Sequence, residues 1–179
     1  MNIEKPESLG QFLAWKPPHI RTLIGSNLLI PQGKLLLVGT YKSWKSMTAM
    51  DMGFCISQGR PWFGFPTTKS TVLMVQLEIP KFAYQDRVIK YFTHHDGIPI
   101  DNIYFVTTRL LKLDKKWGKD ILKTWIDMTQ AQVVIIDPIY KTMSGHLIDE
   151  YDVGLYTDAI DEIIEEKKNL RVSVRVPRG

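Results

Sequence analysis

Short apolar runs alternate along this chain with longer segments in which apolar residues recur every three or four positions. The apolar runs, each about as long as one buried strand, are residues 34–38, 71–78, 102–107, 132–137 and 170–176. The segments with helical spacing are residues 8–15, 47–56, 81–92, 119–128 and 151–168. Strands that alternate with helices in this way predict an α/β fold, with a mostly parallel sheet flanked by helices.

The length of 179 residues indicates one domain. We expect residues 1–32 to form an N-terminal segment that leads into a core of residues 33–179. Within that segment, residues 21–30 are predicted to be strand-like, and a turn at residues 31–33 then enters the next strand. Residues 59–66 form an aromatic loop closed by prolines. We interpret it as a packed surface loop rather than a base-stacking platform, because no basic stripe accompanies it.

One segment predicts a phosphate-binding loop. Its sequence is Gly39-Thr40-Tyr41-Lys42-Ser43-Trp44-Lys45-Ser46. It follows the strand predicted at residues 34–38 and precedes the helix predicted at residues 47–56. In such a loop, backbone N–H groups surround phosphate oxygens, and the helix N-terminus adds the positive end of its dipole. Lys45 would then contact the β- and γ-phosphates of a nucleotide such as ATP, and the Ser46 hydroxyl would hold Mg²⁺.

The loop departs from the pattern G-x-x-x-x-G-K-[ST] because Trp44 stands where the second glycine is expected. Tryptophan keeps its backbone N–H but lacks the conformational freedom of glycine, and we expect its large ring to point away from the nucleotide. The alternative is a lysine- and serine-rich turn between a strand and a helix, with no ligand.

Two later strands end in carboxylates, Glu78 and Asp137. Each has an ordinary explanation, since Glu78 could be a charged residue at a strand exit and Asp137 the start of an Asp-Pro turn. However, the carboxyl ends of parallel strands meet at one edge of an α/β sheet, so the loop and both carboxylates predict a single site there. Tyr140 and Lys141 follow closely and could contact nucleotide or a neighbouring subunit, or simply pack as loop residues.

With these motifs, residues 23–174 resemble the RecA-like P-loop ATPases, and most closely the RepA-type hexameric replicative helicases of plasmids, phages and mobile elements. The resemblance rests on the loop with its Lys42-Ser43 pair, on Leu77-Glu78, on residues 135–141, and on the helix and strand at residues 151–174. It implies a RecA-like fold and Mg²⁺-dependent ATP hydrolysis, in which Glu78 polarises the attacking water and Asp137 lies near Mg²⁺. It also implies single-stranded DNA as a partner and assembly into a homo-hexamer.

In such ATPases, the strand that begins near Leu170 leads to a sensor segment and further strands, whereas this sequence ends at Gly179. We therefore expect a core that is incomplete at its C-terminus, with an unpaired sheet edge, slow hydrolysis, and self-association without a regular hexameric ring. The competing hypothesis is a nucleotide-binding or vestigial assembly module without significant hydrolysis, which Trp44 also favours. A kinase-like phosphotransferase is weaker, because no acceptor-binding lid is apparent.

Composition narrows these hypotheses only slightly. A hydrophobic content of 44% and a charged content of 23% are ordinary for a soluble globular protein. The net charge of +4 is compatible with nucleic acid binding but only weakly favours it. The single cysteine, Cys55, rules out an internal disulfide, and its apolar neighbours indicate a core thiol. No apolar run approaches the ~20 residues of a membrane span, and residues 1–6 do not resemble a signal peptide. A cytoplasmic location is therefore expected.

Overall fold

The structure of the chain is a computed structural model that describes residues 5–16, 22–40, 42–95, 100–144, 150–167 and 171–177. In chain order its elements are α1 (Leu9–Ala14), β1 (Lys34–Gly39), α2 (Lys45–Gln58), β2 (Val72–Gln76), α3 (Lys81–His94), β3 (Ile103–Thr107), α4 (Lys116–Thr129), β4 (Val133–Asp137), the 3-10 helix η1 (Ile139–Thr142), α5 (Glu150–Glu166) and β5 (Arg171–Pro177). α2 and α4 begin somewhat earlier than their apolar spacing predicted.

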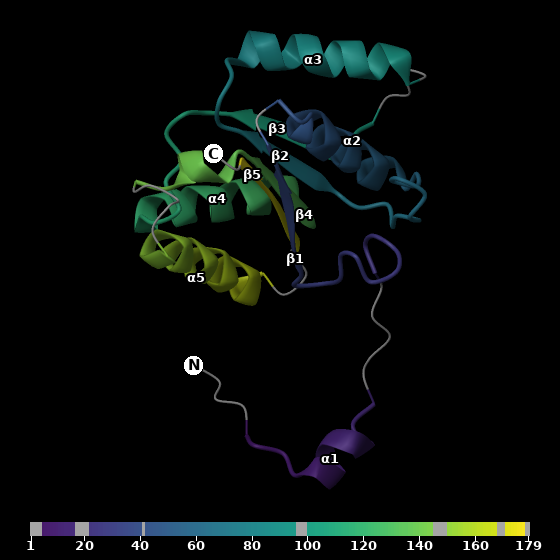
Figure 1. Ribbon diagram of the computed structural model, residues 1–179, viewed down its shortest axis with the longest axis vertical. Helices are drawn as coiled ribbons and strands as arrows, with labels where there is room; N and C mark the ends of the chain where they lie inside the picture. Colours follow the sequence, from purple (N-terminus) through teal and green to yellow (C-terminus); the bar gives the residue numbers. More distant parts are fainter. Residues whose placement is uncertain are drawn as a thin grey trace.

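The described strands form one parallel sheet in the order β1-β5-β4-β2-β3. α2 and α3 cover one face of this sheet, and α4 and α5 cover the other (Figure 1). The predicted α/β fold with a mostly parallel sheet flanked by helices is therefore confirmed. β5 lies between β1 and β4, so β1 and β3 are the two edge strands of the described sheet.

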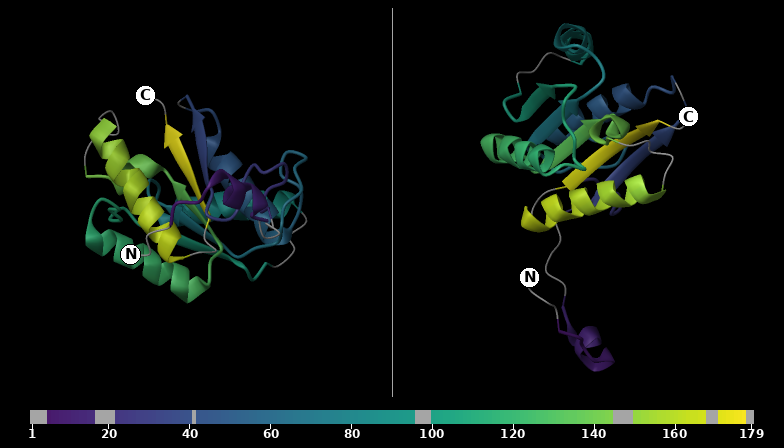
Figure 2. Two further views of the ribbon diagram at one scale, coloured as in Figure 1. Left: turned by 90° about the horizontal axis from the view of Figure 1, so that it is seen from below. Right: turned by 90° about the vertical axis from the view of Figure 1, so that its left-hand side faces the viewer.

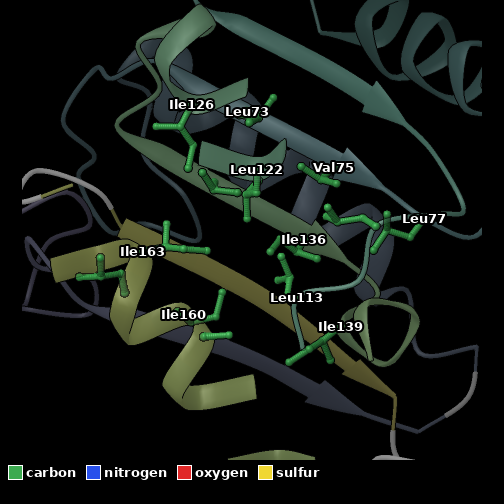
Figure 3. Close-up of a cluster of buried hydrophobic side chains, with 14 of the residues drawn as sticks. Leu73, Val75, Leu77, Leu113, Leu122, Ile126, Ile136, Ile139, Ile160 and Ile163 are labelled. Atoms are coloured by element: carbon green, nitrogen blue, oxygen red, sulfur yellow. The ribbon is translucent and has the colours of Figure 1, made fainter. Parts of the chain in front are cut away.

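Successive residues of the central strands alternate between two hydrophobic cores. In β2, Leu73 and Val75 belong to the core beneath α4 and α5, whereas Val72 and Met74 belong to the core beneath α2 and α3. Figure 3 shows the first of these cores, where side chains of α4 and α5 point toward the sheet. Every residue of β2 and β4 is buried, as expected for parallel strands covered on both faces. The central strands are therefore held from both faces of the sheet.

The prediction that residues 21–30 are strand-like is wrong. Residues 25–28 form a turn in which two residues have positive φ. On either side of that turn, Ile24 and Leu29 pair only through isolated bridges. Both side chains are nevertheless buried in the core beneath α2 and α3. Apolar residues that are buried one by one around a turn thus produced a pattern like that of a strand.

α1 lies apart from the sheet and its helices in Figure 1 and in the right-hand view of Figure 2. Its apolar side chains, Leu9, Phe12 and Leu13, are all exposed. Ser8 caps this short helix and Gln11 completes a capping box, so local hydrogen bonds rather than burial stabilise it. None of the helices in the described part of the chain is long and apolar enough to cross a membrane.

The interpretation of Cys55 as a core thiol is confirmed. The residue is 5% exposed within α2. Its burial, and next the nearby Asp51 carboxylate, raise the pKa of the thiol to about 11. In the aromatic loop that follows α2, Trp62 is also buried, whereas Phe63 at the turn is 71% exposed. This loop is therefore packed against the core through Trp62.

Candidate functional site

The carboxyl ends of the strands bring the predicted site residues to one edge of the sheet. β1 ends at Gly39, where the loop leading to α2 begins, and β4 ends at Asp137. β2 ends at Gln76, which is in register with Asp137, and Glu78 follows two residues later. The structure thus places the loop, Glu78 and Asp137 at the same edge, as the sequence predicted. Tyr41 lies outside the described residues.

Lys45 begins α2 and folds its side chain back over the loop. It is only 8% exposed, and its Nζ donates hydrogen bonds to the Thr40 carbonyl oxygen and, at 3.0 Å, to Ser43 Oγ. Ser43 Oγ in turn donates to the Thr40 carbonyl oxygen at 2.8 Å. Gly39 makes room for this arrangement, because a Cβ there would lie 2.7 Å from Ser43 Oγ. The ammonium group is therefore held among oxygen acceptors inside the loop.

Two loop residues adopt the left-handed conformation that favours glycine. Lys42 has φ 60° and Trp44 has φ 61°, and Trp44 is the N-cap of α2 without a side-chain capping hydrogen bond. The first N–H groups of any α-helix have no intrahelical acceptor, and they point out of its N-terminus. At α2 they point toward the loop, so both the helix dipole and the loop favour an anion there.

The loop lies between two hollows in the surface. The first has a volume of about 510 Å³ and is lined by Lys42, Ser43, Trp44, Lys45, Ser46, Met47 and Arg87. The second has a volume of about 490 Å³ and is lined by Leu36, Leu37, Val38, Gly39, Thr40, Ser43, Lys45 and Thr48. Both volumes are within the usual range for small-molecule sites. Three lysine or arginine side chains line the first hollow, which therefore suits an anionic ligand.

Arg87 lines the first hollow, and its position there could not be predicted from spacing along the chain. It lies on α3, and its proximity to the loop depends on how α3 packs beside α2. Tyr84, one turn earlier on α3, is 6% exposed, and burial is the main reason that its pKa is raised. The Asp137 carboxylate raises that pKa further and the Arg87 guanidinium lowers it, so both charges act on the same phenol. Residues of α3 therefore lie near both the loop, through Arg87, and Asp137, through Tyr84.

A hydrogen-bonded chain joins the ends of β2 and β4. Asp137 is 3% exposed and its Oδ2 accepts a hydrogen bond from Gln76 Nε2 at 3.1 Å. Gln76 Oε1 accepts from the Glu78 backbone N–H at 2.8 Å. Gln76 therefore fixes both carboxylate-bearing residues, although the sequence pattern gave it no role. In the sequence, Gln76 is marked only by its polar side chain between two apolar residues, Val75 and Leu77.

Glu78 differs from Asp137 because its side chain is exposed. Its Oε1 accepts a hydrogen bond from the Tyr140 hydroxyl at 3.2 Å, and the Lys141 ammonium lies 5.2 Å from the centre of the Tyr140 ring. Tyr140 therefore contacts Glu78 rather than serving only as loop packing. No group of three or more histidine, cysteine or acidic residues that could hold a metal ion occurs in the described ranges.

Comparison with known proteins agrees with this fold. The sequence model of the AAA domain family matches residues 4–174, nearly the whole chain. Among solved structures, the chain is similar to a KaiC-like protein from the hyperthermophilic archaeon Pyrococcus horikoshii OT3, with a TM-score of 0.59 and 14% sequence identity. The match covers 87% of this chain and 65% of that structure, and at such low identity it concerns the fold. None of the curated proteins matches the chain. The fold is that of the RecA-like P-loop NTPases.

Proposed function

We propose that this chain, which belongs to the AAA domain family, binds ATP together with Mg²⁺ at the 39–46 loop and hydrolyses the bond to the γ-phosphate. Family membership and fold make the chain a RecA-like P-loop ATPase domain, and such domains bind nucleotide. In this proposal Lys45 binds the phosphates, Ser46 and Asp137 hold Mg²⁺, and Glu78 orients the attacking water.

The environment of Lys45 is the observation that most supports nucleotide binding. A buried ammonium group needs oxygen acceptors to offset its lost hydration, and Lys45 has Thr40 and Ser43 for this purpose. Phosphate oxygens that enter the loop would offer the same ammonium group charged acceptors, which form stronger hydrogen bonds than neutral ones. The binding of a polyphosphate would therefore replace contacts that the loop already makes.

The site offers Mg²⁺ a hydroxyl at the start of α2 and a carboxylate at the end of β4, and this ion prefers carboxylate, hydroxyl, phosphate and water ligands. The Ser46 hydroxyl and the Asp137 carboxylate would hold the ion together with the phosphates. The hydrogen bond from Gln76 Nε2 orients the Asp137 carboxylate, as groups around a metal ligand commonly do. When bound, Mg²⁺ would neutralise part of the charge that develops on the phosphates.

In this proposal, Glu78 acts on water rather than holding the phosphates. Its exposed carboxylate can accept a hydrogen bond from a water molecule that attacks the terminal phosphate, which increases the nucleophilicity of that water. The Tyr140 hydroxyl, 3.2 Å from Oε1, restricts the orientation of this carboxylate. We propose that Tyr140 positions Glu78 without contacting the reacting atoms.

We also propose single-stranded DNA and further copies of this chain as partners, in a role related to the replicative helicases and recombinases of mobile elements. The resemblance of residues 23–174 to RepA-type helicases supports this role, and the net charge of +4 is compatible with it. A nucleotide-binding module without significant hydrolysis is the second candidate. The left-handed Trp44 inside the loop favours that candidate, because the residue alters the loop at the position next to Lys45.

Calorimetric titration with Mg²⁺-ATP and Mg²⁺-ADP tests nucleotide binding. Lys45→Ala should weaken binding by about 10- to 100-fold, the range expected when one charged hydrogen-bond donor is lost. Lys90→Ala, on the exposed part of α3 where Lys90 pairs with Asp86, is the matched control and should bind like the parent. Equal affinities of the parent and Lys45→Ala would show that the loop does not bind the nucleotide.

Turnover then separates the two candidate functions. Release of phosphate from Mg²⁺-ATP, with an increase when single-stranded DNA is added, is expected for the helicase-like ATPase. Tight nucleotide binding without phosphate release in either condition would instead support the module without hydrolysis.

A further inference from the structure

Trp44 has two unfavourable features, one in its backbone and one in its side chain. Its backbone is left-handed, at φ 61° and ψ 12°, which is unfavourable for any residue with a Cβ. Its indole is 76% exposed, and it stacks on no other ring among the described residues. Backbone outliers of this kind are concentrated at functional sites, where a ligand can use the side chain that they present. The position therefore points to a ligand that contacts the indole.

The indole lies beside the residues that would bind phosphates. Trp44 lines the 510 Å³ hollow together with Lys45, Ser46 and Met47 of the first helical turn, and with Arg87 of α3. A nucleotide whose phosphates occupy the loop continues from its α-phosphate through the ribose to the base. The base would then lie in a hollow that borders the loop, and the described residues line two such hollows.

In the described part of the chain, the second hollow offers the base no comparable surface. It runs along β1, and its apolar lining among the described residues consists of Leu36, Leu37 and Val38, with no aromatic ring. The first hollow combines a flat indole with the Met47 side chain, and bases stack well on aromatic rings. The sequence predicted a ring that points away from the nucleotide, whereas the exposed indole lines a hollow that a nucleotide would also enter.

We propose that Trp44 forms one wall of a nucleobase subsite, on which the purine ring of the bound nucleotide stacks. This inference rests on the proposed function, because it requires the triphosphate to occupy the loop. In this proposal, Trp44, which stands where the second glycine is expected, makes the loop bind nucleotides more tightly than bare polyphosphate. Trp44 is then a specificity-determining residue of the same site.

The experiment compares ATP with inorganic tripolyphosphate, both with Mg²⁺, by calorimetric titration of the parent, Trp44→Gly and Trp44→Phe. Glycine adopts the left-handed conformation without strain and restores the usual loop pattern, so it removes the ring while keeping the loop. Trp44→Gly should lose about tenfold in ATP affinity, the scale of one base stacked on one aromatic ring. Its tripolyphosphate affinity should stay within about threefold of the parent, and Trp44→Phe should retain most of the ATP affinity.

Trp117→Ala, a half-exposed tryptophan at the start of α4 on the opposite face of the sheet, serves as the control and should change neither affinity. Equal weakening of both ligands by Trp44→Gly would overturn the inference, because Trp44 would then shape the loop and not bind the base. Unchanged or tighter ATP binding by Trp44→Gly would overturn it as well. A parent chain that binds neither ligand would overturn the proposed function itself, and this inference with it.

Discussion

At the scale of single residues, the two carboxylates of the site are separated by their surroundings. Asp137 is buried at the end of β4 and hydrogen-bonded to Gln76. Glu78 is exposed, and the Tyr140 hydroxyl restricts the orientation of its carboxylate. A buried and fixed carboxylate suits a permanent ligand of a metal ion, whereas an exposed one can exchange water molecules. The loss of the Glu78 charge should therefore affect chemistry more than binding.

Glu78→Gln tests this division directly. The amide keeps the size of the side chain but cannot accept a proton, so the rate of ATP hydrolysis should fall by ~100-fold or more, the scale of a lost general base. The dissociation constant for Mg²⁺-ATP should stay within a few fold of the parent. Steady-state phosphate release and calorimetric titration measure the two quantities, with Glu165→Gln on the exposed side of α5 as the control. Loss of nucleotide binding by a folded Glu78→Gln would contradict the assigned role.

At the scale of elements, ion pairs connect the two helices on the face opposite α2. Lys119 and Lys123 of α4 donate hydrogen bonds to the two carboxylate oxygens of Glu162 on α5. The hydrogen bond from Lys119 is the main reason that the pKa of Glu162 is lowered, and Lys123 lowers it further. A carboxyl group whose pKa is lower in the folded chain stabilises the fold above its unfolded pKa. That contribution is lost as the pH falls through the folded pKa.

We therefore predict that Glu162→Gln lowers the free energy of unfolding at neutral pH, and by a decreasing amount in acid. Because the Glu162 side chain is 44% exposed, the loss at pH 7 should not exceed about 1 kcal/mol. The difference between parent and variant should shrink as the pH falls below about 4, where the carboxyl of the unfolded chain becomes protonated. It should disappear once the pH is also below the lowered pKa of the folded chain. Urea denaturation over a pH series measures it. A difference that stays constant down to pH 2 would show that packing, not charge, is responsible.

At the scale of the whole molecule, the sequence predicted the strands and helices of each layer better than it predicted the contacts between them. Parallel strands covered on both faces are continuous apolar runs, so β2 and β4 could be located from those runs alone. The turn at residues 25–28 could not be predicted, because apolar residues buried singly around a turn produce the same pattern as a strand. Gln76 and Arg87 were missed for another reason. Their roles depend on the register of β2 with β4 and on the packing of α3 beside α2, which no spacing along the chain reveals.

The open edge of the sheet is the feature with the largest consequence for assembly. β1 pairs with β5 on one side and with no other described strand. Its side chains alternate, so that Leu35 and Leu37 pack against the core beneath α2 and α3, whereas Leu36 and Val38 are 53% and 45% exposed. An edge strand with exposed apolar side chains offers both backbone hydrogen bonds and a hydrophobic surface to another chain.

We predict that the chain self-associates through this edge, and that the double variant Leu36→Lys/Val38→Lys shifts it toward the monomer. Lysine on an edge strand opposes pairing, because a second strand would have to bury the charge or place it beside a like charge. Sedimentation velocity over a concentration series measures the association. Tyr104→Lys on β3, the opposite edge strand, where Tyr104 is 41% exposed, is the matched control and should associate like the parent. If association survives the β1 substitutions but is lost in Tyr104→Lys, the contact lies at β3 and the prediction is wrong. A parent chain that stays monomeric at every concentration would also refute the prediction.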